Sequence, residues 1–74
     1  MTTERKLPFD CQVGTHNEIV ANCFSGETIE LQPDAVAVYD TIIGAEHLGY
    51  YKTVQQGLSW FRQHYPREYM VLLD

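Results

Sequence analysis

Three residues that start or stop helices, Pro33, Gly49 and Pro66, divide the second half of this chain into segments of helical length. Proline suits the first position of a helix, because that position needs no amide donor, and glycine often ends one by adopting the left-handed backbone conformation. Apolar residues recur with helical spacing between these positions. The sequence therefore predicts helices over residues 33–48 and 51–65.

The first predicted helix carries more apolar surface than one neighbouring element can cover. Val36, Tyr39 and Ile43 lie along one row of this helix. A second apolar row lies beside it and contains Ala35, Val38, Ile42 and Ala45. Because a stripe this wide needs contacts on more than one side, we expect a core built around this helix.

The second predicted helix has one apolar face, formed by Val54, Leu58, Phe61 and Tyr65. Gly57 lies on the neighbouring row, where glycine costs up to about 1 kcal/mol of helix propensity relative to alanine. A close approach of the first helix would account for this glycine.

Residues 66–73 are predicted to form a short third helix that begins at Pro66. A terminal strand is the alternative, because the segment Tyr69–Leu73 is also compatible with β-structure. A segment this apolar is expected to dock on the core or on a partner.

Residues 9–31 lack a helical period. β-Branched residues and alternation of polar with apolar residues indicate strands instead, and Ser25-Gly26 is typical of the turn between them. We predict a β-hairpin in which residues 18–23 pair with residues 27–31.

The predicted fold is therefore a small α+β domain with an N-terminal β-hairpin, an antiparallel helical hairpin and a short C-terminal helix. A flexible tail is expected over residues 1–8, and residues 9–74 are expected to form a single domain. An isolated two-stranded hairpin is marginal in water, so an all-α domain with an irregular N-terminal arm is the alternative.

Residues 48–66 resemble the second half of a tetratricopeptide-type helical hairpin. The residues that carry the resemblance are Leu48-Gly49-Tyr50-Tyr51, Val54, Leu58, Phe61 and Pro66. Val54 and Phe61 are larger than the small residues of that family, so the resemblance implies a shared helical-hairpin geometry and not membership. Such arrays need about three repeats to bury their faces. With one repeat, this chain would rely on its N-terminal hairpin, its C-terminal segment or self-association.

The chain as a whole also resembles short proteins of tailed phages and aquatic metagenomes. The resemblance lies in the stretch from Asn22 to Asp40 and in the ending Tyr69–Asp74. It implies no particular activity.

Charge is distributed unevenly along the chain, whose net charge is −5. Residues 7–51 contain seven carboxylates and neither lysine nor arginine. The candidate acidic patch is Glu27, Glu30 and Asp34, which would suit a basic protein partner; a solvated acidic face is the alternative. Direct binding of nucleic acid is disfavoured, because phosphate contacts need clustered cations.

Composition also bears on the compartment. No apolar run approaches the roughly 20 residues that span a bilayer, and the N-terminal residues lack the apolar segment of a secretory signal. We therefore expect a cytoplasmic protein, not associated with a membrane, in which Cys11 and Cys23 are reduced thiols.

Sites for catalysis or metal binding are weakly indicated. Cys11, His16 and Cys23, with His47 or His64 as a fourth ligand, lack the tight pairing of a structural zinc site. A nucleophilic Cys23 activated by His16 would lie in an acidic region, which opposes thiolate formation. The carboxylate pairs Glu27/Glu30 and Asp40/Glu46 are expected to be solvated, and the glycines match no phosphate-binding loop. We predict no catalytic residue, metal or cofactor.

Six of the nine aromatic residues lie within residues 50–69. Tyrosine and tryptophan are enriched at interface hot spots, although core packing would also explain them. The candidate interface residues are Trp60, Tyr50, Tyr69 and Leu72. The chain is thus predicted to be a non-catalytic interaction module that forms a homodimer or higher homo-oligomer. A phage-type acidic effector that binds a basic surface of a host protein is the alternative.

Overall fold

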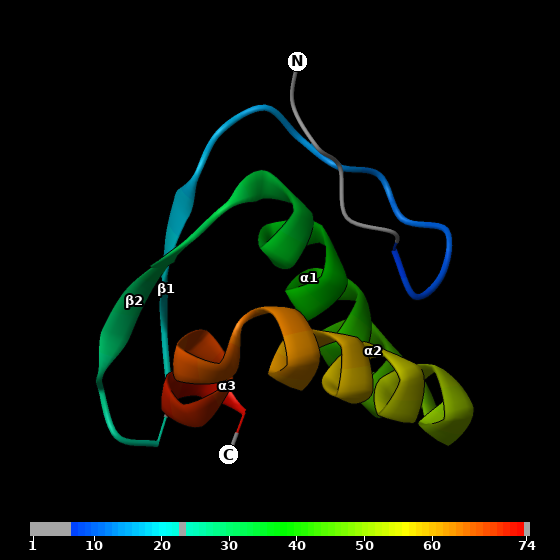
Figure 1. Ribbon diagram of the computed structural model, residues 1–74. Coiled ribbons are helices and arrows are strands. Elements are labelled where there is room, and N and C mark those ends of the chain that lie inside the picture. Colours follow the sequence, from blue (N-terminus) through cyan, green and yellow to red (C-terminus); the bar gives the residue numbers. More distant parts are fainter. Residues whose placement is uncertain (1–6, 23, 74) are drawn as a thin grey trace.

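The computed structural model describes residues 7–22 and 24–73 and shows a β-hairpin followed by three helices (Figure 1). The elements are β1 (Glu18–Ala21), β2 (Thr28–Leu31), α1 (Pro33–Leu48), α2 (Tyr51–His64) and α3 (Pro66–Leu72). This confirms the predicted α+β class. It also decides between the two predictions for the last segment, because α3 is a helix and not a strand.

The hairpin packs one face on the helices and leaves the other in solvent. β1 and β2 are antiparallel, with Val20 opposite Ile29 and Ile19 opposite Glu30. Val20 and Ile29 are half-buried, and Leu31 at the end of β2 is fully buried. Because side chains alternate between the two faces of a strand, Ile19 and Glu30 lie on the outer face.

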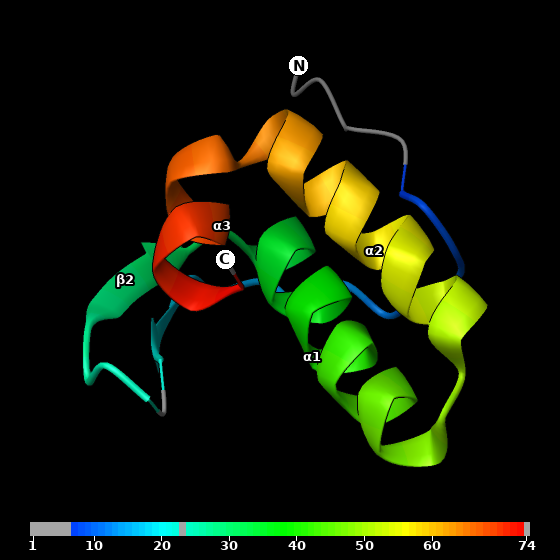
Figure 2. The same cartoon turned by 90° about the horizontal axis from the view of Figure 1, so that it is seen from below.

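Gly49 ends α1, as predicted, and turns the chain back into α2. Its φ of 75° is left-handed, and its amide donates to the carbonyl of Glu46 while that of Tyr50 donates to Ala45. This pattern satisfies the last carbonyl groups of the helix. Figure 2 shows α1 and α2 side by side and running in opposite directions from this turn.

The first turns of α1 are buried on nearly every side. Four consecutive residues are buried there: Ala35, Val36, Ala37 and Val38. Neighbours come from α2, from β2 and from the segment that precedes the hairpin, in which Leu7, Phe9 and Cys11 are half-buried against the core. This arrangement agrees with the wide apolar stripe expected for α1. The sequence predicts a flexible tail over residues 1–8, and residues 1–6 of this segment lie outside the described residues.

The buried face of α2 differs from the predicted one. Val54, Phe61 and Tyr65 are buried as expected, but Gly57 is buried too and Leu58 is only half-buried. A Cβ atom on Gly57 would lie 2.8 Å from Ile42 Cδ1 and closer still to Ile42 Cγ1. The glycine therefore lets α1 approach closely, which confirms the prediction for Gly57. The same approach moves the buried face toward Gly57 and away from Leu58.

Two side-chain hydrogen bonds tie distant parts of the chain together. The Tyr65 hydroxyl donates to Asp34 Oδ1 at 2.6 Å, which joins the end of α2 to the start of α1. The side-chain amide of Asn22 donates to the Val71 carbonyl at 2.7 Å, which joins the hairpin to α3. The hairpin is thus held against the helices by both packing and a specific bond.

Candidate interaction surfaces

The four candidate interface residues separate into two buried and two surface residues. Trp60 is only 6% exposed, and its ring packs against Phe61 and Tyr65. Leu72 is likewise buried in the core. Tyr50 is 60% exposed at the turn between α1 and α2, and Tyr69 is half-buried on α3.

Trp60 and Leu72 therefore do not form an exposed interface in the monomer, and the prediction needs correction for both. The physical reason for Trp60 is the shifted face of α2. Once Gly57 faces α1, the residue three positions further along the helix turns toward the core as well. Small domains have few large apolar side chains, so the one tryptophan is used for packing.

Among residues 7–22 and 24–73, the most exposed large apolar side chain is Phe24, at 96%. It lies in the turn of the β-hairpin, which sequence reasoning did not connect with an interface. Other large apolar residues at the surface are Val13, Ile19, Leu48, Tyr51 and Met70. The signal for Phe24 was available in principle, because Ser25-Gly26 marks a turn and a turn projects its side chains away from the core.

The backbone around Phe24 is held in place by Asn22. The Asn22 carboxamide oxygen accepts the amide of Phe24 at 2.8 Å and that of Ser25 at 3.2 Å. Backbone hydrogen bonds from the Asn22 amide to Glu27 and from the Gly26 amide to Asn22 close the turn. Since Asn22 also bonds to α3, Phe24 stands on a turn that is anchored to the body of the domain.

The three residues of the candidate acidic patch differ in their exposure to solvent. Glu27 and Glu30 are exposed, and Glu30 accepts a hydrogen bond from the Asn17 side chain at 3.0 Å. Asp34 is half-buried, and its Oδ1 accepts the Tyr65 hydroxyl and the amide of Ala35. Asp34 therefore has a structural role at the start of α1, and the carboxylates open to a partner are those of the hairpin.

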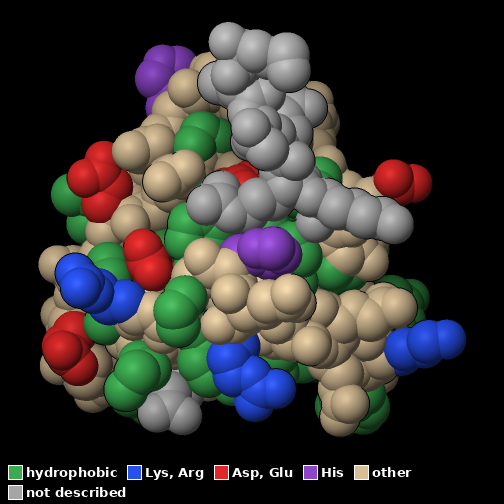
Figure 3. Space-filling view, in the orientation of Figure 1, with side chains coloured by type: hydrophobic (Ala, Val, Ile, Leu, Met, Phe, Trp, Pro, Cys, Tyr) green, Lys and Arg blue, Asp and Glu red, His purple; other side chains and the backbone are tan. Residues whose placement is uncertain are grey.

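The outer face of α2 has the opposite character. α2 contains no aspartate or glutamate, and Lys52, Gln55, Ser59 and Arg62 follow one another along its solvent side. Apart from Arg5 and Lys6, which lie outside the described residues, the lysine and arginine residues of the chain are Lys52, Arg62 and Arg67. Figure 3 shows the described cations well apart from one another across this side of the molecule, with carboxylates beside the one at the left edge.

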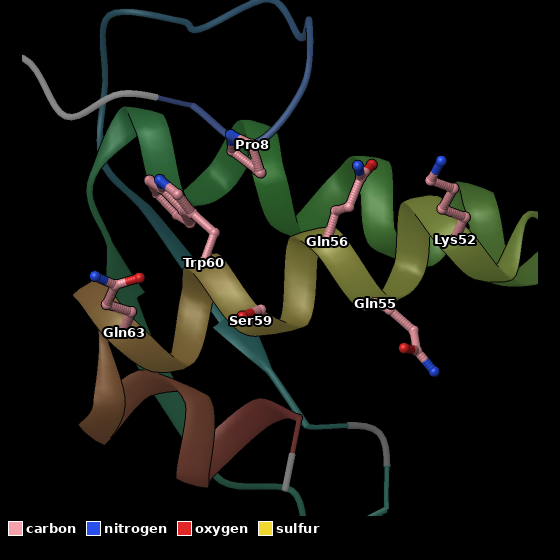
Figure 4. A pocket seen from close by; sticks show the side chains of 7 residues that line it. All are labelled: Pro8, Lys52, Gln55, Gln56, Ser59, Trp60 and Gln63. Atoms are coloured by element: carbon pink, nitrogen blue, oxygen red, sulfur yellow. The ribbon is translucent and has the colours of Figure 1, made fainter.

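Two hollows lie on either side of this row of polar residues on α2. One has a volume of about 520 Å³, and Figure 4 shows Lys52, Gln56 and Trp60 on its α2 side with Pro8 opposite. The second, called here the α2–α3 hollow, has a volume of about 310 Å³. It is lined by Gln55, Leu58, Ser59, Arg62 and Tyr69.

The α2–α3 hollow combines apolar and cationic groups. Leu58 and Tyr69 are half-buried at its wall, and Arg62 is exposed beside them. Leu58 is available there because the buried face of α2 is centred on Gly57. Tyr69 thus lines this hollow, as Trp60 lines the first one.

The residues considered for metal or thiol chemistry are not brought together within the described chain. No three of its histidine, cysteine, aspartate and glutamate side chains lie close enough to hold a metal ion. Cys23 falls outside the described residues, so the sets that include it do as well. Burial, followed by the charge of Asp10, raises the pKa of the half-buried Cys11 thiol, which favours the unreactive neutral form.

The carboxylate pairs Glu27/Glu30 and Asp40/Glu46 consist of exposed residues, as expected for solvated groups. Within residues 7–22 and 24–73, no helix has the length and apolar character needed to cross a membrane. Comparison with known proteins found no matching family model, no matching curated protein and no matching solved structure.

Proposed function

We propose that this protein is a small, non-catalytic protein–protein interaction module that associates with a second copy of itself. The observation that carries this proposal is Phe24, a large apolar side chain almost completely exposed on a turn that hydrogen bonds hold in place. When a partner covers an exposed apolar side chain of this kind, the free energy of the system falls, which favours association.

The remaining surface supports the same function. Leu48, Tyr50 and Tyr51 expose three further apolar side chains at one turn. Exposed apolar groups gathered in one place are typical of interaction sites, whereas scattered ones are ordinary. A chain of 74 residues buries only about 60% of the surface of its unfolded form, so association is an efficient way to cover the rest.

Sedimentation velocity and light scattering test this proposal directly. We expect a mass that rises with micromolar concentration from 8.5 kDa toward twice that value. A particle that stays at 8.5 kDa throughout the micromolar range would overturn the proposal.

The exposed hairpin carboxylates favour a second candidate function, an acidic effector that binds a basic surface of a host protein. In that case capture of the host protein from a lysate weakens with salt and with the double substitution Glu27→Gln and Glu30→Gln. If the captured amount of host protein changed neither with salt nor with the double substitution, this function would be contradicted. The mass measurement distinguishes the two functions, because an effector of this kind needs no second copy.

A further inference from the structure

We infer that Phe24 of one copy inserts into the α2–α3 hollow of a second copy, with the hairpin carboxylates facing the cations of α2. This inference rests on the proposed self-association and names the two surfaces that make the contact. It commits to the hairpin of a second copy as the occupant of the hollow.

Part of the lining of the hollow suits a phenyl ring. The α2–α3 hollow is open to solvent and has a volume of about 310 Å³, so a phenyl ring can enter it from the surface. Leu58 offers apolar contact, Tyr69 an aromatic edge or face, and Arg62 a cation that can lie over the ring.

The anchored turn makes insertion favourable. The Asn22 side chain already bonds to the amides of Phe24 and Ser25 and to the carbonyl of Val71. Little backbone freedom is therefore lost when Phe24 is covered, and preorganised groups of this kind bind more tightly than mobile ones.

Charge selects this pairing over the two symmetric alternatives. If two hairpins met edge to edge through β1, Glu18, Glu27 and Glu30 of both copies would come together. If two α2 faces met, Lys52 and Arg62 of both copies would do so. Of these three arrangements, contact between the hairpin of one copy and α2 of the other is the one that brings opposite charges together.

Lys52 and Arg62 lie ten residues apart on α2, which is about 15 Å along the helix. In a dimer with a two-fold axis this contact occurs twice, because each copy contributes one hairpin and one hollow.

A pair of charge-swapped full-length chains tests the inference. In an Arg62→Glu dimer both contacts place a new carboxylate of α2 against the hairpin carboxylates, with Lys52 as the remaining cation of α2, and in a Glu27→Arg/Glu30→Arg dimer both place cation against cation. A mixed dimer of these two variants has opposite charges at both contacts. We expect each variant alone to dimerise at least about tenfold more weakly than the natural chain, and an equimolar mixture to recover most of the affinity.

Phe24→Ser tests the apolar contact, and Val13→Ser is its control. Both remove an exposed apolar side chain, but Val13 lies in the segment before the hairpin and takes no part in the inferred contact. We expect the dimer dissociation constant to rise about tenfold or more for Phe24→Ser and to change little for Val13→Ser. Circular dichroism verifies that each variant is folded.

The outcomes separate this inference from the proposed function. A natural chain that stays monomeric overturns both. A natural chain that dimerises, together with a Phe24→Ser variant of unchanged affinity or a charge-swapped mixture that fails to recover, overturns only the contact inferred here.

Discussion

At the scale of single residues, Gly57 controls how closely the two long helices approach each other. We expect Gly57→Ala to lower the free energy of unfolding, because its Cβ would overlap the side chain of the fully buried Ile42. Overpacking of this kind costs about 1–3 kcal/mol, and alanine returns up to about 1 kcal/mol of helix propensity. With the full gain in propensity the expected net loss is at most about 2 kcal/mol, measured by urea unfolding.

Gly44→Ala is the matched control for this substitution. Gly44 lies in the middle of α1, and a Cβ there would have no atom within 4 Å. The same change is therefore expected to stabilise the chain by up to about 1 kcal/mol. Equal effects at both glycines would show that the approach of α1 to Gly57 has no energetic consequence.

At the scale of elements, the helices could be predicted because their signals are local. Pro33, Gly49 and Pro66 each act on their own neighbours, so α1, α2 and α3 begin and end within about a residue of the expected positions. The hairpin followed from its turn and its alternation. β1 ends at Ala21 and Asn22 begins the turn, so the strand is shorter than expected, and Cys23 at the end of the predicted strand lies outside the described residues.

The surfaces were harder to predict, because they depend on contacts between elements. The periodicity of α2 placed Leu58 on the buried face, but the close approach at Gly57 turned Trp60 inward and left Leu58 at the edge of a hollow. Asp34 could not be separated from the hairpin carboxylates by sequence, since its partner Tyr65 is 31 residues away. Phe24 is exposed because its turn points away from the helices.

The docking of the hairpin on α3 depends on one side chain, and Asn22→Asp tests it. Aspartate keeps an oxygen for the amides of Phe24 and Ser25, but it loses the donor to the Val71 carbonyl and places a negative charge beside that oxygen. An unsatisfied or repelled group of this kind costs about 1–3 kcal/mol. We expect amide hydrogen exchange in α3 to accelerate more than exchange in α1.

Asn17→Asp is the control for this substitution, because it makes the same chemical change at an exposed asparagine near the hairpin. The side-chain amide of Asn17 donates to the exposed Glu30. The effect of Asn17→Asp on stability is expected to stay within about 0.5 kcal/mol. If Asn22→Asp left exchange in α3 as slow as Asn17→Asp does, the bond to Val71 would not hold the two elements together.

At the scale of the whole molecule, two electrostatic effects oppose each other during association. Each copy carries a net charge of −5, so two copies repel each other at long range. The inferred contact places opposite charges close together at short range. The longest dimension of one copy is 37 Å, which is close to the Debye length of about 30 Å at 0.01 M ionic strength.

This difference in range predicts that the affinity of the dimer passes through a maximum as salt increases. From about 0.01 M to about 0.15 M sodium chloride the screening length falls from about 30 Å to about 8 Å, which removes the repulsion between whole molecules but leaves the close pairs. Toward 1 M it falls to about 3 Å, and the pairs between the hairpin and α2 weaken as well. We therefore expect sedimentation equilibrium to give the smallest dissociation constant at intermediate salt.

The variant Glu27→Gln/Glu30→Gln separates the two effects, because it removes hairpin carboxylates and changes the net charge from −5 to −3. With less repulsion and fewer pairs, its affinity at high salt is expected to stay nearly level where that of the natural chain declines. A natural chain whose dimer strengthens steadily up to 1 M would be held together by apolar contact alone. In that case charge would not favour contact between the hairpin and α2 over the two symmetric arrangements. The position of Phe24 in the hollow would then depend on shape only.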